Sequence, residues 1–258
     1  MNLKTIVVVP ARMASSRYPG KPLAPIAGLP MIEHVRRRAL LAEGVAEVVV
    51  ATCDQAIFDT VTQAGGRAVM TADTHERSSE RVAEAMESLE GDVVVVAQGD
   101  EPTLLPETLT LVASPFHADP TVQAVSLLSP LESEADFHTP NVVKAARDLA
   151  GRVIYYSRAP IPYFMKPGSA PIYRETGIRA FTAKALQEYV RLPETPLEKV
   201  ESVDMFRLLE HGRTIHSVVT NETTLGVDHP EDVALAEAAI ARDPVQRNLH
   251  EQIGGRLS

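Results

Sequence analysis

The first half of the chain alternates short apolar runs with segments of helical periodicity, and this alternation limits the folds open to it. Most of the apolar runs are rich in β-branched residues, which predicts strands buried on both faces. These strands are expected over Thr5–Val9, Val45–Thr52, Arg67–Met70 and Val93–Ala97. Apolar residues at helical spacing predict helices over Pro30–Ala42, Ile57–Ala64 and Ser79–Leu89. Strands that alternate with helices favour an α/β fold with a doubly wound, mostly parallel sheet.

The second half of the chain has a different pattern. Val142–Ala146 and Val153–Ser157 flank the stretch Asp148–Gly151, which predicts a β-hairpin. The proline-rich stretch Ala159–Pro171 predicts a loop. Further helices are expected over Thr182–Leu192, Leu197–Glu210 and Pro230–Arg242. We therefore predict one domain, residues 1–258, with an antiparallel lobe inserted at approximately residues 130–190.

Charge and cysteine content exclude several classes of protein. The chain has 25 Lys and Arg against 34 Asp and Glu, a formal net charge of −9. Such a chain lacks the basic face that nucleic acid or an anionic membrane requires, so we expect neither as a partner. The single cysteine, Cys53, excludes a disulfide framework and a multi-cysteine zinc site. It fits a reducing compartment, and we expect a cytoplasmic location.

The segment after the first strand concentrates positive charge. Residues 1–32 carry four basic side chains and no acidic one, and Arg12, Arg17 and Lys21 all follow that strand. In an open α/β sheet, ligands bind beyond the carboxyl ends of the strands. Guanidinium, ammonium, hydroxyl and backbone N–H groups are the donors that a polyphosphate needs. The segment lacks the glycines of a P-loop or of a dinucleotide fingerprint, and a surface loop with solvated cations is the alternative.

Two acidic segments are candidate metal sites. Asp100 lies in Gln98–Pro102, directly after a buried strand, where a carboxylate can hold Mg²⁺ or belong to an ordinary turn. Asp228 lies in Gly226–Asp232, just before the last predicted helix. It is either a second metal ligand or the cap of that helix.

A polar stretch from His75 to Arg81 precedes the third predicted helix. The N-terminus of a helix can bind an anion or a polar base edge. The alternative is an ordinary helix start, in which the polar side chains only satisfy the first turn.

Together and in this order, these segments resemble the 3-deoxy-manno-octulosonate (KDO) cytidylyltransferases, also called CMP-KDO synthetases. The similarity runs from Val7 to about Glu237 and is most specific in Pro10–Leu23, Gln98–Pro102, Tyr156–Pro162 and Gly226–Asp232. It implies a Rossmann-like fold of the nucleotide-diphospho-sugar transferase type. It also implies that an anionic acceptor attacks the α-phosphorus of CTP and that pyrophosphate leaves. Family members are usually homodimers through the inserted lobe, so a homodimer is expected.

The resemblance also implies roles for individual residues. The candidate catalytic residues are Lys21, Arg12, Asp100 and Asp228, and the two aspartates match positions that hold Mg²⁺. The candidate CTP-binding residues are Ala11, Arg12, Ser15, Arg17, Lys21, Ser78, Ser79, Arg81 and Gln98. The candidate acceptor-binding residues are Arg158, Glu175, Arg179 and Asp204.

The acceptor site departs from the family pattern. Glu175 stands where the family has His, Arg179 where it has Tyr, and Met205 where it has Gln. Losing hydroxyl partners and gaining a guanidinium suits a smaller and more anionic acceptor. The resemblance implies KDO or a close 3-deoxy-2-ulosonate as the acceptor, and these departures motivate the alternative, phosphonoformate, a CMP acceptor in phosphonate antibiotic pathways. A non-catalytic nucleotide-binding relative is the alternative of another class, and the intact candidate catalytic residues argue against it.

Overall fold

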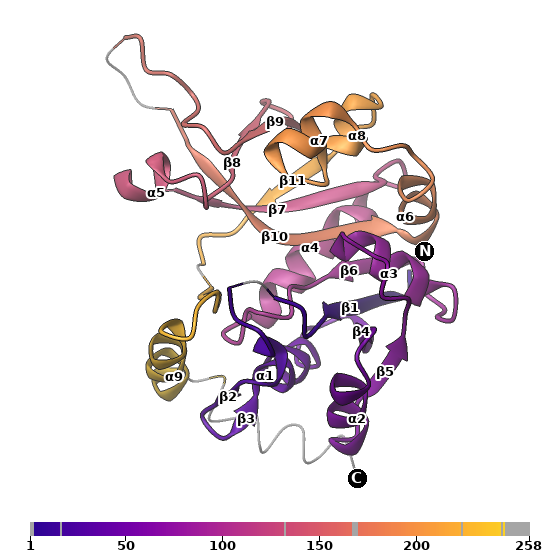
Figure 1. The fold of residues 1–258 in the computed structure, drawn as a ribbon. Coiled ribbons are helices and arrows are strands. Elements are labelled where there is room, and N and C mark those ends of the chain that lie inside the picture. Colours follow the sequence, from indigo (N-terminus) through magenta and orange to yellow (C-terminus); the bar gives the residue numbers. More distant parts are fainter. Residues whose placement is uncertain are drawn as a thin grey trace. The chain divides into compact units, whose positions relative to one another are not determined.

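The computed structural model describes residues 3–15, 17–131, 133–166, 170–222, 224–243 and 245. The chain forms two compact units (Figure 1). The first unit comprises Leu3–Thr110 and the chain from Thr224 onward, and the second comprises Leu111–Thr223. The predicted lobe at approximately residues 130–190 falls within the second unit. Its role in acceptor binding and dimerisation stays a prediction.

The first unit is built on four parallel strands in the order β6-β1-β4-β5. They are β1 (Thr5–Ala11), β4 (Val45–Thr52), β5 (Arg67–Met70) and β6 (Val93–Val96), which confirms the four predicted strands. Every residue of β1 and β6 is buried, as expected for central strands covered on both faces. The predicted α/β fold with a mostly parallel sheet is therefore confirmed.

Helices alternate with these strands as predicted. They are α1 (Met31–Ala39), α2 (Gln55–Gln63) and α3 (Ser78–Met86). Between β1 and α1 lie a short 3₁₀ helix, η1 (Lys21–Leu23), and a small hairpin of β2 (Pro25–Ile26) and β3 (Leu29–Pro30). Gly20 precedes η1 with a φ of +76°, a left-handed conformation that glycine adopts without steric cost.

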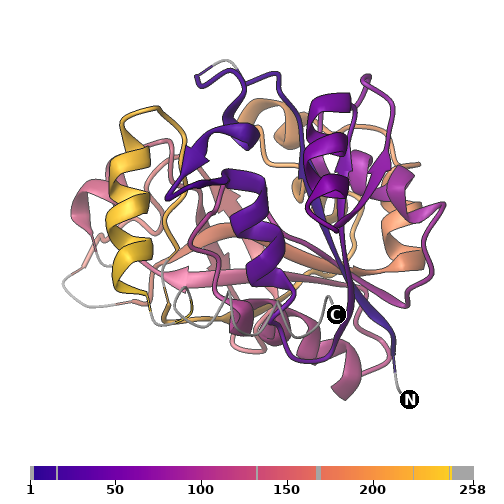
Figure 2. The same ribbon diagram turned by 90° about the horizontal axis from the view of Figure 1, so that it is seen from below.

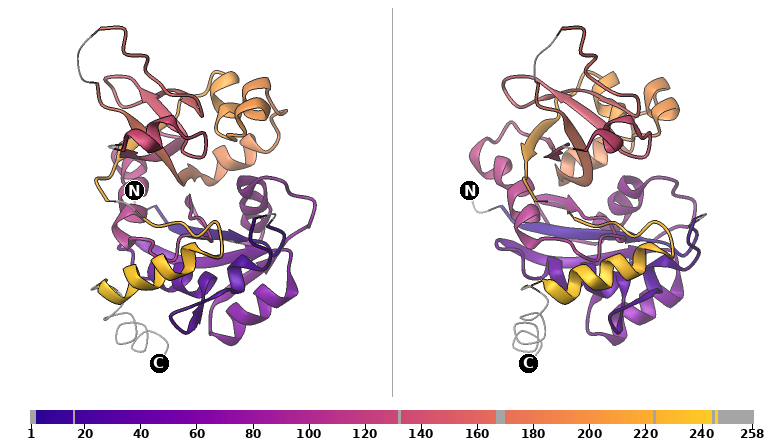
Figure 3. Two further views of the ribbon diagram at one scale, coloured as in Figure 1. Left: turned by 60° about the vertical axis from the view of Figure 1, so that its left-hand side comes forward. Right: turned by 90° about the vertical axis from the view of Figure 1, so that its left-hand side faces the viewer.

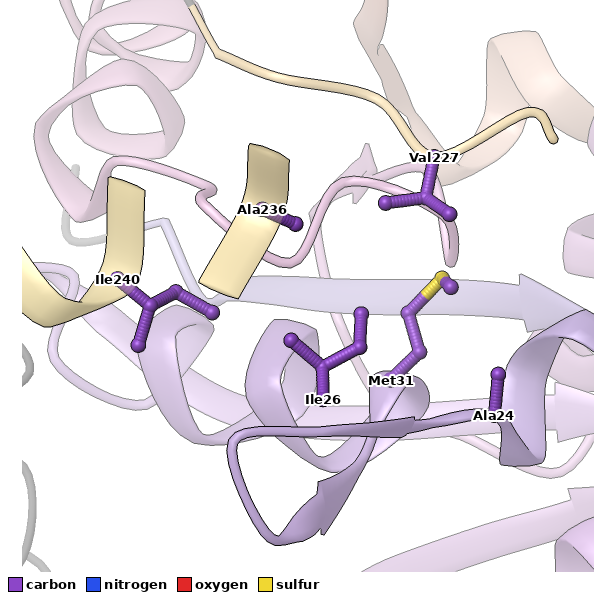
Figure 4. Close-up of a cluster of buried hydrophobic side chains, with 6 residues drawn as sticks. All are labelled: Ala24, Ile26, Met31, Val227, Ala236 and Ile240. Atoms are coloured by element: carbon purple, nitrogen blue, oxygen red, sulfur yellow. The ribbon is translucent and has the colours of Figure 1, made fainter. Parts of the chain in front are cut away.

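Helix α9 (Asp232–Arg242) brings the end of the described chain back to the N-terminal segment. It confirms the last predicted helix, and Figure 2 shows it beside the β2–β3 hairpin. A buried apolar cluster joins the two segments (Figure 4); it consists of Ala24, Ile26, Met31, Val227, Ala236 and Ile240. Because buried apolar area stabilises by roughly 25 cal/mol per Å², this cluster holds the residues before α9 against the segment that follows β1.

The second unit contains a largely antiparallel sheet. Strand β10 (Tyr173–Thr182) pairs antiparallel with β7 (Ala124–Pro130) and with β8 (Lys144–Arg147). The predicted hairpin is confirmed, because β8 pairs antiparallel with β9 (Val153–Ser157). Strand β11 (His216–Val219) lies parallel to β7.

Helix α4 (Pro106–Ala118) carries the chain from the first unit into the second, which also contains α5 (Glu134–His138) and α6 (Ala183–Tyr189). The described residues of the predicted loop Ala159–Pro171 form neither helix nor strand, and its residues Pro167–Ser169 lie outside the described residues. In the part of the chain that the structure describes, no helix has the length and apolar character needed to cross a membrane.

The single helix predicted over Leu197–Glu210 is wrong. Two short helices, α7 (Pro196–Glu201) and α8 (Phe206–Glu210), stand in its place and are drawn in orange in Figure 3. Ser202, which follows α7, has a φ of +52°. The Arg207 guanidinium donates to the buried Glu198 carboxylate at 2.9 and 2.6 Å. In a continuous helix, residues nine positions apart lie about 13 Å apart along the axis. The ion pair therefore forms only because the chain turns back between the two helices.

Candidate functional site

A cavity of about 370 Å³ lies in the first unit at the carboxyl ends of β1 and β6, next to the start of α3. Nine predicted site residues line it: Ala11, Arg12, Ser15, Arg17, Lys21, Ser78, Arg81, Gln98 and Asp100. Gly99 lets the segment after β6 approach β1 closely, because a Cβ there would lie 2.9 Å from the carbonyl oxygen of Pro10. Ser79, also predicted to bind CTP, is fully buried in the first turn of α3.

Lys21 joins the two predicted metal ligands. Its Nζ lies 2.7 Å from Asp100 Oδ2 and 3.3 Å from Asp228 Oδ1. Arg17 Nη2 also lies 2.9 Å from Asp228 Oδ1. The Lys21 side chain is 11% exposed, whereas those of Asp100 and Asp228 are 37% and 46% exposed. Both carboxylates are therefore open to a ligand while the ammonium is held between them.

Asp228 reaches this position because its segment is bound to the segment that follows β6. The N–H of Val227 donates to the carbonyl oxygen of Asp100 at 2.9 Å, and the N–H of Leu225 donates to Thr103 Oγ1 at 2.7 Å. The Asp228 carboxylate contacts Lys21 and Arg17, and its role as a metal ligand stays a prediction. It does not act as the helix cap, since Glu231 occupies the N-cap position of α9.

The donor set of the two aspartates suits a divalent cation. Carboxylate oxygens are preferred ligands of Mg²⁺, which usually takes one or two carboxylates together with phosphate oxygens and waters. In the described ranges, no group of three or more His, Cys, Asp or Glu side chains could hold a metal ion by itself. Asp100 and Asp228 therefore fit a cation that arrives with, or shares ligands with, a polyphosphate.

The start of α3 forms the opposite side of the cavity. Arg81 donates to Thr71 Oγ1 at 2.5 Å and to the carbonyl oxygen of Ala72 at 3.1 Å. Its Nη2 is buried and has no hydrogen-bond partner among the described residues. Glu84 pairs with His75, and its carboxylate accepts the N–H of Ala72. Desolvation opposes the shift, but these hydrogen bonds hold the pKa of Glu84 below its ordinary value.

Three of the four predicted acceptor residues lie together in the second unit. The register of β10 against β7 shifts between Glu175 and Arg179, which are paired with Leu128 and Ser126. Because their partners are two residues apart on β7, Glu175 and Arg179 face the same side of the sheet. Arg179 forms an ion pair with Asp204 in which both side chains are buried.

The Glu175 carboxyl group lies in the least favourable environment of the three. Its Oε1 atom is buried and, within the residues described, has no hydrogen-bond partner. Burial raises the pKa of Glu175, and the positive charge of Arg179 offsets only part of this effect. A buried carboxyl group of this kind favours its neutral form, which can donate a hydrogen bond.

The fourth predicted acceptor residue, Arg158, is held by backbone groups. Its guanidinium donates to the carbonyl oxygens of Glu201, Pro140 and Ser202 at 2.5, 2.8 and 3.3 Å. These bonds use three of the five N–H groups of the side chain. Arg158 therefore ties β9 to the end of α7 and keeps limited capacity for a ligand.

Sequence reasoning missed the residues that place these side chains. Thr103 holds the Asp228 segment, and Asp54 accepts the N–H of Met13 at 2.8 Å in the loop that carries the basic residues. Both contacts join segments far apart in the sequence, so no local pattern marks them. One sequence signal could have pointed to Asp54. It follows β4, and the carboxyl end of β4 lies next to that of β1 in a parallel sheet.

The chain is similar to known proteins over most of its length. A family model described as cytidylyltransferase matches residues 6–215. A 3-deoxy-manno-octulosonate cytidylyltransferase of Bradyrhizobium diazoefficiens is 42% identical over 93% of this chain and 98% of its own length. The enzyme of the same name from Geobacter sulfurreducens is 38% identical over 90% of this chain and 97% of its own.

Solved structures give the same result. The structure of a CMP:2-keto-3-deoxy-manno-octonic acid synthetase complexed with CTP is 38% identical to this chain, with a TM-score of 0.88. The match covers 93% of this chain and 99% of that one.

Proposed function

The chain belongs to the cytidylyltransferase family, and from this premise we propose that it transfers CMP from CTP to KDO or a close 3-deoxy-2-ulosonate. The chain is a CTP-dependent nucleotidyltransferase. The observation that carries the proposal is the contact of Lys21 with both Asp100 and Asp228 at the cavity. A module that only binds a nucleotide has no need for two exposed carboxylates around one ammonium.

The basic residues of the loop after β1 receive the triphosphate. Arg12, Arg17 and Lys21 supply two guanidiniums and an ammonium, which neutralise phosphate charge and orient the α-phosphorus. Transfer of this type depends on positioning and charge stabilisation more than on a covalent enzyme intermediate. The hydroxyl oxygen of the acceptor forms a bond to the α-phosphorus, the bond to the pyrophosphate oxygen breaks, pyrophosphate leaves, and the hydroxyl proton passes to water.

Asp100 and Asp228 hold the metal in this proposal. Mg²⁺ bound there would neutralise charge that develops on the phosphate oxygens. Lys21 keeps the two carboxylates together until the nucleotide arrives. A cation held by Asp100 and Asp228 would supply positive charge to the carboxylates, and the Lys21 ammonium would then be free to donate to a phosphate oxygen.

The remaining cavity residues bind the nucleoside. Ala11, Ser15 and Gln98 line the cavity from the β1 and β6 sides, and Ser78 and Arg81 line it from α3. The unpartnered Nη2 of Arg81 offers a donor to an acceptor atom of cytosine. Ser79 is assigned to support of this turn, since its side chain is buried.

The charge of the acceptor cluster favours a ulosonate over a compact polyanion. The positive charge of Arg179 is already met by Asp204, and Glu175 adds a second carboxyl group. Such a cluster offers hydrogen bonds to hydroxyl groups but little net positive charge. The guanidinium that suggested phosphonoformate is therefore not available as a free cation. The homodimer and the cytoplasmic location stay predictions.

A panel of acceptors tests the proposed function. Pyrophosphate release from CTP and Mg²⁺ is measured with KDO, a second 3-deoxy-2-ulosonate, phosphonoformate and no acid. We expect release with KDO or its relative and only background release with phosphonoformate. Release with phosphonoformate alone would overturn the acceptor assignment. Release with none of the acids by a protein that binds CTP would overturn the catalytic one.

A further inference from the structure

Asp54 occupies the N-cap position of α2 but does not cap that helix. Aspartate is among the residues preferred at this position, because its carboxylate can accept an N–H of the first turn. In the part of the chain described, the Asp54 side chain makes no such bond to α2. Its Oδ2 instead accepts the N–H of Met13 at 2.8 Å, across 41 positions of sequence.

The backbone of Met13 holds the basic loop, the segment from Arg12 to Lys21 that follows β1. The carbonyl oxygen of Met13 accepts the N–H of Gly20 and the N–H of Ser15, both at 3.0 Å. The first of these bonds closes the loop that contains Arg17 and brings its end to Lys21. Arg12 directly precedes Met13 on the other side. The two backbone groups of one residue, the N–H and the C=O of Met13, therefore fix the start and the closure of the segment that carries the cations.

We infer that Asp54 is a positioning residue for CTP binding, which acts by holding the Met13 peptide. The inference rests on the proposed role of this loop in receiving the triphosphate. A carboxylate bond to a backbone N–H is charge-assisted and stronger than a neutral one, so it is suited to fixing a loop. The Asp54 carboxylate makes this bond to the loop in place of a bond to the first turn of α2.

The sign of the mutational effect separates positioning from charge. Asp54 is an acidic group beside a site for a polyanion, so its negative charge by itself opposes CTP binding. If only this charge mattered, Asp54→Ala and Asp54→Asn would both tighten CTP binding. If Asp54 positions the loop, Asp54→Ala weakens binding, whereas Asp54→Asn retains it because the amide oxygen can still accept the Met13 N–H.

The test measures the dissociation constant of CTP by titration calorimetry on the full chain, without acceptor. We expect about five- to tenfold weaker binding for Asp54→Ala and binding within about twofold of wild type for Asp54→Asn. Asp59→Ala is the matched control, since it removes an acidic side chain from the same helix, where the Asp59 carboxylate accepts a hydrogen bond from Gln55. In steady-state kinetics, the KM for CTP rises in Asp54→Ala while the KM for the acceptor is unchanged.

A second variant keeps the test decisive if Asp54→Ala does not fold. Serine is also a preferred N-cap residue but is one bond shorter, so Asp54→Ser caps α2 and does not hold Met13. Weakened CTP binding by a folded Asp54→Ser supports the inference. Wild-type or tighter binding by Asp54→Ala or Asp54→Ser overturns it. Absence of turnover with KDO in a wild-type protein that binds CTP would overturn the proposed function alone.

Discussion

Lys21 Nζ lies 2.7 Å from Asp100 Oδ2, although 79 positions of sequence separate the two residues. The contact exists because β1 and β6 are adjacent parallel strands, so the segments that follow them leave the sheet at the same edge. The same ammonium also lies 3.3 Å from Asp228 Oδ1, and packing of α9 against the β2–β3 hairpin holds the Asp228 segment in place for this contact. The contacts of Lys21 with Asp100 and Asp228 therefore depend on both segments that form the first unit, Leu3–Thr110 and the chain from Thr224 onward.

Asp100→Asn should abolish turnover without abolishing CTP binding. The amide is a weak metal ligand, and loss of metal assistance lowers the rate by at least about 100-fold. At the same time the ammonium of Lys21 loses one carboxylate partner and becomes more available to phosphate. We expect metal-free CTP binding, measured by calorimetry in the presence of a chelator, to be as tight as in wild type or tighter. Retained pyrophosphate release would refute the metal role of Asp100.

Thr103→Val should weaken metal binding although Thr103 is not one of the proposed metal ligands. The substitution keeps the shape of the side chain but removes the oxygen that accepts the N–H of Leu225 at 2.7 Å. We expect a several-fold rise in the Mg²⁺ concentration needed for half-maximal rate, because loss of one hydrogen bond is worth about 1 kcal/mol. Thr103→Ser keeps the acceptor and serves as the control. An equal effect of both variants would contradict the account of how Asp228 is placed.

Arg179→Tyr should lower activity on the native acceptor far more than it changes the dependence on CTP. The substitution leaves the buried Asp204 carboxylate without its ionic partner in the second unit. The CTP-lining residues belong to the first unit, so the KM for CTP should stay within about twofold. Unchanged KM and kcat for the acceptor would exclude Arg179 from the acceptor site.

Glu175→Gln should make the protein more stable than wild type, and this difference should grow as the pH rises. The pKa of Glu175 is raised in the folded state, chiefly by burial, so the folded protein binds this proton more tightly than the unfolded chain does. The associated stability is fully present below the ordinary pKa of a glutamate and is lost as the pH rises through the raised value. The amide of the glutamine variant does not ionise, so the variant does not lose this stability.

The melting temperature measured against pH tests this expectation. Glu175→Gln should gain over wild type at neutral pH, and the difference should shrink toward about pH 4, near the ordinary glutamate value. Glu188→Gln is a partly exposed carboxyl control in the same unit and should show no such trend. A Glu175→Gln difference that does not vary with pH would contradict the prediction.

Local sequence pattern was sufficient for the four parallel strands of the first unit and for α1, α2, α3 and α9, but it did not predict the β2–β3 hairpin or α4. Runs such as Val93–Val96 are buried on both faces, so every residue is apolar and the pattern is plain. It failed for Leu197–Glu210, where the apolar spacing suits one helix. There the buried ion pair between Glu198 and Arg207 requires two.

The site residues predicted from the sequence include the side chains that line the cavity, and they omit the groups that position other residues. Arg12, Lys21 and Asp100 carry a chemical signature in the sequence, because a polyphosphate and its metal require those residue types. Asp54 and Thr103 have no such signature, since each holds a backbone N–H that only the tertiary structure brings near. The buried pairing of Arg179 with Asp204 was also invisible, because the sequence shows a guanidinium but not its partner.

The most direct test of the central claim is ³¹P NMR of the wild-type protein with CTP, KDO and Mg²⁺. We expect the signals of CTP to be replaced by pyrophosphate and by a single phosphodiester, in equal amounts, because one CMP is transferred for each pyrophosphate released. Unchanged CTP, or phosphate release without a phosphodiester, would contradict the assignment of this chain as a cytidylyltransferase that acts on a ulosonate.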